Sequence, residues 1–398
     1  MRCDLVMAND VSGPVAFRAL ERMGVERVFD PAKVVMVADH FMPAKDARSA
    51  QLQKRLKEWS EAQGVTFYGQ GRGGIEHTLL AEEGWIVPGA VVAGGDSHTC
   101  TYGALGAFGT GLGSTDIAAC LAVGEFWQRV PGTIQVELSG EKGPFVTGKD
   151  VILAVIGELG VGGGTNMALE FVGDGARDLS IDERLAVANM AVEAGAETGL
   201  FPADATTEAY LEGRVEAGWR AEATDPGADV AQRLELDLSA LPPLVALPHL
   251  PGNVVPLDEA RGRRIDQVYI GNCANGTMTD LRQTAEVLRG RRVHTGCRAI
   301  VVPATQRIYR EALKEGLLDV FVEAGAIVST PTCGACFGGH MGVLCAGEAA
   351  VTTTNRNFKG RMGSPEAGVH LANAYVAAAA AVAGELVHPG EVLEEAPA

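Results

Sequence analysis

The chain has 398 residues, with 33 Lys and Arg against 50 Asp and Glu, which gives a formal net charge of −17. This excess of acid argues against a nucleic-acid-binding protein, because phosphate backbones are held by clustered Lys and Arg. Hydrophobic residues make up 47% and charged residues 21%. That is an ordinary globular composition and excludes a disordered chain.

The N-terminus and the cysteines indicate the compartment. The first residues lack a basic region followed by an apolar run and a cleavage site, so a secretory signal is not expected. The longest apolar stretch, residues 374–384, is far shorter than the roughly 20 residues that cross a bilayer. We therefore expect a cytoplasmic protein, whose eight cysteines are thiols, metal ligands or catalytic groups rather than disulfides.

The first third of the chain predicts an α/β layer structure. Residues 34–40 (VVMVADH) are predicted to be a buried strand, residues 91–98 (VVAGGDSH) a second strand, and residues 46–63 a helix with a charged face. This alternation favours a largely parallel sheet, in which ligands gather at the carboxyl ends of strands. Both predicted strands end in acids and histidines, namely Asp39, His40, Asp96, Ser97 and His98.

A second part of the chain begins with a predicted strand near residue 133. A helix over residues 146–160 follows, and a further helix starts at Ser180, with Glu183 at capping-box spacing. From residue 202 to residue 264 the composition becomes acidic and Pro-rich. We interpret this stretch as a linker or an irregular crossing between domains.

The alternation of strands and helices resumes at residue 265. Strands are predicted over 265–273 and 298–305 and helices over 280–290 and 308–316, and the segment 324–336 (AGAIVSTPTCGAC) continues the alternation. The sequence therefore predicts an α/β protein. Its parts are a first α/β domain (1–131), a second α/β domain (132–205), a linker (206–264) and a third α/β domain (265–398).

Residues 109–114 (GTGLGS) imitate a dinucleotide-binding fingerprint. That fingerprint needs a strand immediately before it and an acid about 20 residues after it, and the sequence shows neither convincingly. We interpret these glycines as permitting close packing of a helix and a loop.

Three cysteines lie at predicted strand-to-loop junctions: Cys273 in GNCANG, and Cys333 and Cys336 in TPTCGACFGG. They could be small buried residues without a ligand. They could belong to a zinc knuckle, although this segment has one Phe and no Lys or Arg beside it. They could also hold an iron–sulfur cluster by three thiolates, which leaves one iron open as a Lewis acid. The zinc alternative would use Cys333, Cys336, His340 and Cys345.

Four strings resemble the aconitase superfamily and occur in its order: GGDSHTCTYGALGAFGTGLGSTDIA, GNCANGTMTDLR, PTCGACFGGHMG and TTTNRNFKGRMGSP. The likeness extends from about residue 4 to residue 387. It implies three α/β/α domains around a central iron–sulfur cluster. It also implies a [4Fe–4S] cluster on Cys273, Cys333 and Cys336, with the fourth iron left to the substrate.

The resemblance also implies roles for other residues in a reversible dehydration. Such a reaction needs a proton donor for the departing hydroxyl, a base for the carbon-bound proton and cations for the carboxylates. Asp39 and His40 match the donor pair, and Glu170 matches a carboxylate that orients a histidine. The other implied catalytic residues are His77, Asp96 and His98. The implied substrate-binding residues are Asn9, Asn355, Arg356 and Arg361, and the implied supporting residues are Ser97, Asp116 and Asn275.

The likeness is greatest to the large subunits of two-subunit family members. It implies interconversion of 2-isopropylmalate and 3-isopropylmalate in leucine biosynthesis. The alternatives are the homoaconitase large subunit of lysine biosynthesis and, more distantly, an RNA-binding regulatory protein. Full-length aconitases continue into a swivelling fourth domain with a serine base, whereas this chain stops at Ala398. The resemblance therefore implies a separate small subunit that carries this domain.

Overall fold

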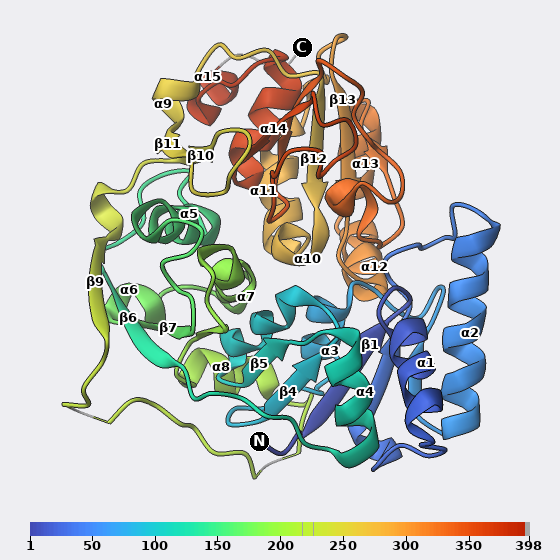
Figure 1. Cartoon of the computed structure of the whole chain (residues 1–398). Helices are drawn as coiled ribbons and strands as arrows, with labels where there is room; N and C mark the ends of the chain where they lie inside the picture. Colours follow the sequence, from blue (N-terminus) through green and yellow to red (C-terminus); the bar gives the residue numbers. More distant parts are fainter. Residues whose placement is uncertain (217, 226, 395–398) are drawn as a thin grey trace. The chain divides into compact units, whose positions relative to one another are not determined.

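A computed structural model of the chain describes residues 1–216, 218–225 and 227–394 (Figure 1). The chain folds as two compact units. Unit 1 comprises Met1–Ser139 and Gly162–Leu236, and unit 2 comprises Gly140–Val161 and Asp237–Ala398. The division into three domains and a linker stays a prediction, and its residues 217, 226 and 395–398 lie outside the described residues.

Unit 1 contains a five-stranded parallel sheet in the order β3-β2-β1-β4-β5. Its strands are β1 (Leu5–Asn9), β2 (Val34–Val37), β3 (Thr66–Tyr68), β4 (Val91–Gly94) and β5 (Phe108–Gly111). Both predicted strands are present but end earlier than predicted, at Val37 and Gly94, and the predicted helix between them is α2 (Ala47–Gln63). The strand order reverses between β1 and β4, which is the point where doubly wound sheets bind ligands.

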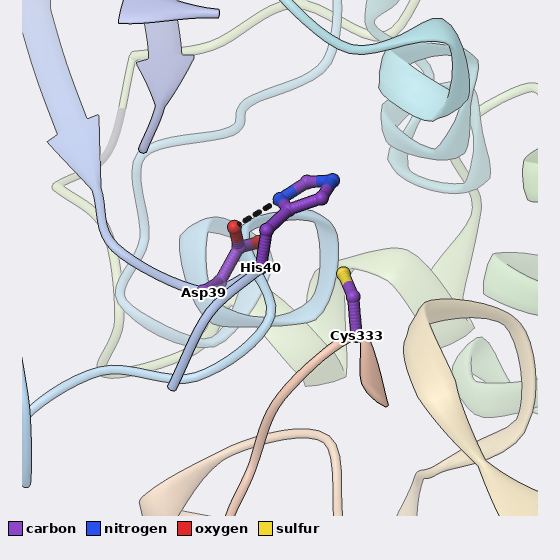
Figure 2. A group of neighbouring side chains, drawn as sticks. All are labelled: Asp39, His40 and Cys333. Carbon is purple, nitrogen blue, oxygen red and sulfur yellow. Dashed lines mark hydrogen bonds and ion pairs between the residues drawn. The ribbon is translucent and has the colours of Figure 1, made fainter. Parts of the chain in front are cut away.

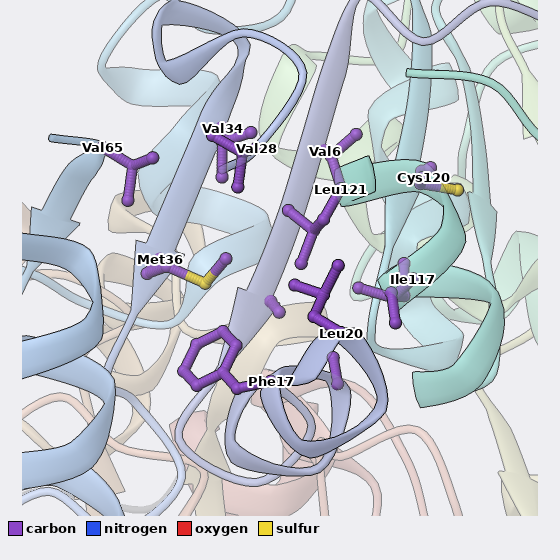
Figure 3. Close-up of a cluster of buried hydrophobic side chains, with 14 of the residues drawn as sticks. Val6, Phe17, Leu20, Val28, Val34, Met36, Val65, Ile117, Cys120 and Leu121 are labelled. Atoms are coloured by element: carbon purple, nitrogen blue, oxygen red, sulfur yellow. The ribbon is translucent and has the colours of Figure 1, made fainter. Parts of the chain in front are cut away.

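Both faces of this sheet are buried, so its strands read as continuous apolar runs. In β1, Val6 packs into one core cluster and Met7 into another. The first cluster, shown in Figure 3, includes Phe17 of α1 (Gly13–Met23) and Leu121 of α4 (Ser114–Val123). The second cluster includes side chains of the helices α3 (Glu76–Glu82), η2 (Ser97–Leu105) and α7 (Ile181–Asn189).

A four-stranded sheet in the order β8-β7-β6-β9 completes unit 1. Its strands are β6 (Gly132–Ser139), β7 (Met167–Val172), β8 (Thr198–Leu200) and β9 (Gln232–Asp237). The predicted capping box is confirmed at the start of α7, where Ser180 and Glu183 bond each other's backbone N–H. The remaining helices are η1 (Pro31–Lys33), α6 (Asp174–Arg177), η3 (Met190–Ala194) and α8 (Ala205–Leu211).

Unit 2 contains a seven-stranded sheet in the order β11-β10-β16-β15-β12-β13-β14. Its strands are β10 (Leu244–Ala246), β11 (Val254–Pro256), β12 (Gln267–Gly271), β13 (Arg298–Val302), β14 (Ile327–Val328), β15 (Ala349–Thr352) and β16 (Gly368–Leu371). Strands β12 to β16 are parallel. The order β14-β13-β12-β15-β16 repeats the order of β3-β2-β1-β4-β5, so a second switch point lies between β12 and β15.

The helices of unit 2 follow the alternation predicted from the sequence. They are α5 (Gly148–Leu159), η4 (Leu238–Ala240), α9 (Leu257–Ala260), α10 (Asn272–Asn275), α11 (Met278–Leu288), α12 (Gln306–Lys314), α13 (Leu317–Glu323), η5 (Gly334–Phe337), α14 (Ala374–Ala383) and α15 (Pro389–Glu394). None of the helices in the described part of the chain has both the length and the apolar character of a membrane span.

The Pro-rich stretch interpreted as an irregular crossing contains regular structure. Strand β10 pairs antiparallel with both β11 and β16. Each of β10 and β11 spans three residues, with prolines at 243, 248, 251 and 256 in and around them. Because proline cannot donate to a sheet ladder, these strands stay short and are hard to predict from periodicity.

The glycines of GTGLGS serve close packing, as the sequence analysis interpreted them. The sequence did not predict the strand β5, at whose end these glycines lie. A Cβ atom on Gly109 would lie 2.2 Å from the carbonyl oxygen of Thr99, and one on Gly111 would lie 2.5 Å from that of Asp96. Glycine is needed here because β5 runs against the loop that follows β4.

The buried His370 of β16 should make the folded chain less stable in acid. Its Nδ1 lies 3.1 Å from the carbonyl oxygen of Ala350, and burial lowers its pKa from 6.5 to about 4. Between these values the unfolded chain binds a proton that the folded chain does not, so acidification from pH 7 to pH 4 removes about 3 kcal/mol of stability. The free energy of unfolding, measured by urea titration, should therefore fall by that much less for His370→Gln than for the wild-type chain between pH 7 and pH 4.

Candidate active site

The carboxyl ends of the strands in unit 1 bring acids and histidines together. Asp10 follows β1, Asp39 and His40 follow β2, and Asp96 follows β4. His77 joins them from the first turn of α3. The predicted residues thus lie where the switch point of the sheet places a ligand.

Asp39 holds the ring of His40, as Figure 2 shows. His40 Nδ1 lies 2.6 Å from Asp39 Oδ1, and a carboxylate can only accept, so Nδ1 is the donor. The other Asp39 oxygen accepts the backbone N–H of Glu76 at 3.0 Å. His40 Nε2 then faces Asp96 Oδ2 at 3.6 Å. A histidine held in this way is suited to proton transfer through Nε2.

Asp10 is a buried acid that the sequence analysis missed. Its Oδ1 accepts the backbone N–H groups of Asp39 and His40 at 3.3 and 3.0 Å, and its Oδ2 accepts that of Phe41 at 3.0 Å. Burial raises the pKa of Asp10. Asp10 therefore fixes the backbone of the loop that carries His40, and its position directly after a strand was the available signal.

Asp96 connects two further histidines. Its Oδ1 accepts from His77 Nε2 at 2.9 Å and from the backbone N–H of His98 at 2.8 Å. Burial raises the pKa of Asp96, but the hydrogen bonds from His77 and His98 outweigh this and hold the pKa well below its usual range. Asp96 is thus an anion between His77 and His98. Ser97 lies beside it, with Oγ 3.5 Å from His98 Nδ1.

A second carboxylate, Glu193 of η3, orients His98. Its Oε1 lies 2.9 Å from His98 Nε2, and both side chains are buried. The sequence analysis expected Glu170 to orient a histidine. Within the described residues, the Glu170 carboxylate instead accepts from Gln135 Nε2 at 3.0 Å and from the backbone N–H of Thr224 at 3.2 Å. In this structure, the carboxylate at His98 Nε2 is therefore Glu193, and a catalytic role for Glu170 stays a prediction.

The structure also gives the surroundings of Asn9, a predicted substrate-binding residue, and of Asp116, a predicted supporting residue. Asn9 Oδ1 accepts from the backbone N–H groups of Val11 and Ser12 at 3.0 and 2.9 Å, and its Nδ2 donates to Glu76 Oε1 at 2.9 Å. The amide oxygen of Asn9 therefore holds the backbone of the loop after β1. Asp116 lies exposed in the first turn of α4, and among the described residues it makes no hydrogen bond or ion pair to the histidines.

Glu76 adds a fully buried acid to this group. Burial raises its pKa well above the usual range, and the charges of Asp39 and Asp96 raise it further. Its Oε2 is buried without a hydrogen-bond partner among the described residues. Glu76 therefore supports the amide of Asn9 by accepting its hydrogen bond.

In unit 2, one asparagine joins two of the predicted cysteines. Asn355, which follows β15, donates from Nδ2 to Cys273 Sγ at 3.3 Å, and its Oδ1 accepts from Cys336 Sγ at 3.4 Å. Cys273 lies in α10, directly after β12. Cys333 and Cys336 lie after β14, at the start and within η5. All three thiols are buried, and Cys333 is drawn in Figure 2.

A single zinc ion does not fit these cysteines. Zinc–sulfur bonds of about 2.3 Å bring the ligand atoms of one ion within about 4 Å of one another. Among the described residues, the groups of three or more ligand atoms within 4.8 Å of one another include neither the set Cys273, Cys333 and Cys336 nor the knuckle set with His340 and Cys345. The zinc-knuckle alternative is therefore wrong.

The wider spacing suits a cluster, in which each thiolate binds a different iron. The surroundings agree with this. Tyr269 Oη donates to the carbonyl oxygen of Cys333 at 3.2 Å, and a Cβ atom on Gly334 would lie 2.3 Å from that hydroxyl oxygen. Glycine at 334, with φ +58, thus lets the loop pack on Tyr269. The donor set of three buried thiols and one amide fits an iron–sulfur cluster.

The two predicted carboxylate-binding arginines lie in the loop between β15 and β16. Arg356 and Arg361 are both half-buried. Arg361 Nε is buried without a hydrogen-bond partner among the described residues. An unsatisfied guanidinium N–H is costly to bury, so an anionic ligand would satisfy a group that this chain leaves open.

Lys149 of α5 is a fully buried cation that the sequence analysis did not single out. Its Nζ donates to the carbonyl oxygens of Thr353 and Thr354 at 2.8 and 2.6 Å and to Asn275 Oδ1 at 3.3 Å. Burial lowers its pKa to about 8, and the charge of Asp280 is the largest of the contributions that oppose this lowering. Lys149 is therefore still charged at pH 7.

The chain belongs to the aconitase family. The model of that family, described as aconitate hydratase, matches residues 1–263 and 258–384. A crystal structure of aconitase X from Thermococcus kodakaraensis in its holo form aligns with a TM-score of 0.53 at 12% identity, over 90% of this chain and 84% of that one. The fold is thus aconitase-like, and the family implies an iron–sulfur cluster.

Two relatives are much more similar in sequence. The 3-isopropylmalate dehydratase large subunit 2 of Rubrobacter xylanophilus is 75% identical over 99% of this chain and 93% of its own length. The 3-isopropylmalate dehydratase large subunit of Desulfitobacterium hafniense is 52% identical over 98% of this chain and 93% of its own length. This similarity extends across both units.

Proposed function

We propose that this chain is the large, catalytic subunit of a 3-isopropylmalate dehydratase, a hydro-lyase of leucine biosynthesis. The observation that carries the proposal is the network of His40, His77 and His98 with their carboxylates in unit 1, which is buried or half-buried. Removal and return of water need proton donors and acceptors held in fixed orientations. The choice of substrate rests on the 75% identity to the relative of that name.

The proposed cofactor is a [4Fe–4S] cluster on Cys273, Cys333 and Cys336, with one iron not bound by cysteine. When bound, it supplies a Lewis acid for the substrate hydroxyl. Asn355 holds two of the sulfurs and so fixes their spacing. The homology to aconitase-family enzymes and the buried thiols support this assignment.

The chain's own residues handle protons and charge in this proposal. His40, with Nδ1 held by Asp39, gives a proton to the departing hydroxyl through Nε2. Asp96 remains ionised and holds His77 and His98 in place. Arg356 and Arg361 bind the carboxylates of the substrate, because the guanidinium fork matches a carboxylate in two hydrogen bonds.

The proposed partner is a small subunit that carries a swivelling domain with the serine base. The names of the relatives, which are large subunits, support a partner of this kind. We place the enzyme in the cytoplasm, where reducing conditions preserve both an oxygen-sensitive cluster and the eight free cysteines.

Reconstitution tests this function. The purified chain is loaded anaerobically with iron and sulfide, mixed with a small subunit of the same kind of enzyme, and assayed with 2-isopropylmalate. We expect turnover only in the mixture, and less than about one hundredth of it with homoaconitate, because the wrong side group leaves polar groups unpaired. Full activity of the chain alone would contradict the partner, and a preference for homoaconitate would contradict the substrate.

A further inference from the structure

Lys149 ties together the loops on which the proposed cluster depends. Its side chain extends from α5 and contacts residues that lie 126 and 204 positions further along the chain. Asn275 lies two residues after Cys273, and Thr354 directly precedes Asn355. One ammonium group therefore fixes both the loop that carries a cysteine and the loop that carries the amide bonded to two sulfurs.

The hydrogen bonds of Lys149 are complete, but none of the acids whose charges favour its ammonium, Asp280 and Asp150, forms an ion pair with it among the described residues. Three oxygens use its three N–H donors. Two are backbone carbonyls and one is an amide, and no ion pair to Lys149 forms within the described residues. A buried charge without a counter-ion costs free energy. The nearest acids, Asp150 and Asp280, are occupied by capping boxes at Thr147 and Thr277.

We propose that Lys149 is a positioning residue for the cluster, which fixes the loops of Cys273 and Asn355 and supplies the positive charge that balances the bound thiolates. This inference rests on the cluster of the proposed function. It explains why a lysine, rather than an apolar residue, occupies a fully buried position in α5. The bound thiolates would add to the opposing charges of Asp280 and Asp150, neither of which forms an ion pair with Lys149.

Three variants of the full chain test this inference. Lys149→Met removes the charge and keeps the length of the side chain. Lys149→Gln keeps an amide donor without the charge and replaces the Met variant if that variant does not fold, as judged by the melting temperature of the metal-free chain. Lys142→Met is the matched control, because it removes one positive charge from a half-buried position in the same segment.

The readouts are iron and sulfide content after anaerobic loading, the rate of iron release to a chelator, and the reduction potential of the cluster. We expect iron release to be about 10-fold to 100-fold faster in the Lys149 variants. We also expect a lower potential, because reduction adds negative charge beside a site that has lost its cation. The Lys142 control should match the wild-type chain in all three.

The outcomes separate this inference from the proposed function. A wild-type chain that takes up no iron and sulfide would contradict the proposed function before Lys149 is considered. A wild-type chain that is loaded, with Lys149 variants that match it, would overturn the role of Lys149 alone. Faster iron release with an unchanged potential would also overturn it, since lost packing by itself can loosen the loops.

Discussion

Replacing Glu193 with Gln should lower kcat roughly 100-fold, which is the scale of a misplaced general acid or base. In the described part of the chain, Glu193 is the carboxylate that contacts His98 Nε2, with its Oε1 at 2.9 Å. Gln keeps the size of the side chain but removes the charge and can turn a donor toward the ring. His98 would then lose its fixed orientation, while the carboxylate-binding arginines stay intact, so KM should change little.

Glu170→Gln is the matched control. Glu170 is a buried glutamate of the same unit, but its partners are Gln135 and the backbone of Thr224. Its replacement should change the melting temperature rather than kcat. The measurement is steady-state kinetics of both variants, loaded with cluster and mixed with the small subunit. If Glu170→Gln lost more kcat than Glu193→Gln, the assignment of the histidine-orienting carboxylate would be reversed.

The buried strands and the residues at their ends were predictable because two simple signals coincide there. A strand covered on both faces reads as an apolar run, as in residues 34–37, and the polar residue that follows lies at the ligand-binding edge. Asp39, His40 and Asp96 were found in this way. The same rule, applied to the strand that ends at residue 9, would have identified Asp10 as a site residue.

Glu193 and Lys149 were not predictable from local signals. Glu193 lies 95 residues from His98, in a short 3-10 helix that follows no strand, and its contact exists only because α7 and η3 pack against η2. Lys149 lies in the first turn of a helix, where a lysine normally reaches solvent. Its burial follows from the packing of α5 in unit 2, and no periodicity reports such a tertiary contact.

Cys336→Ser should abolish cluster assembly and lower activity by more than about 1,000-fold, since a Lewis acid contributes several kcal/mol to such a step. Serine fits the buried position of Cys336 and can still donate to Asn355 Oδ1, which lies 3.4 Å from the sulfur. The metal-free variant should therefore fold. The measurement is the iron and sulfide content of the variant after anaerobic loading, together with the visible absorbance of the loaded protein.

Cys345→Ser is the control for this experiment, because Cys345 belongs to the same segment and was a ligand only in the zinc alternative. Its side chain is exposed, and the neighbouring Glu348 raises the pKa of its thiol, which disfavours the thiolate that a metal needs. This variant should load iron and sulfide like the wild-type chain. A normal four-iron cluster in Cys336→Ser, or its loss in Cys345→Ser, would mean that the three ligands are not Cys273, Cys333 and Cys336.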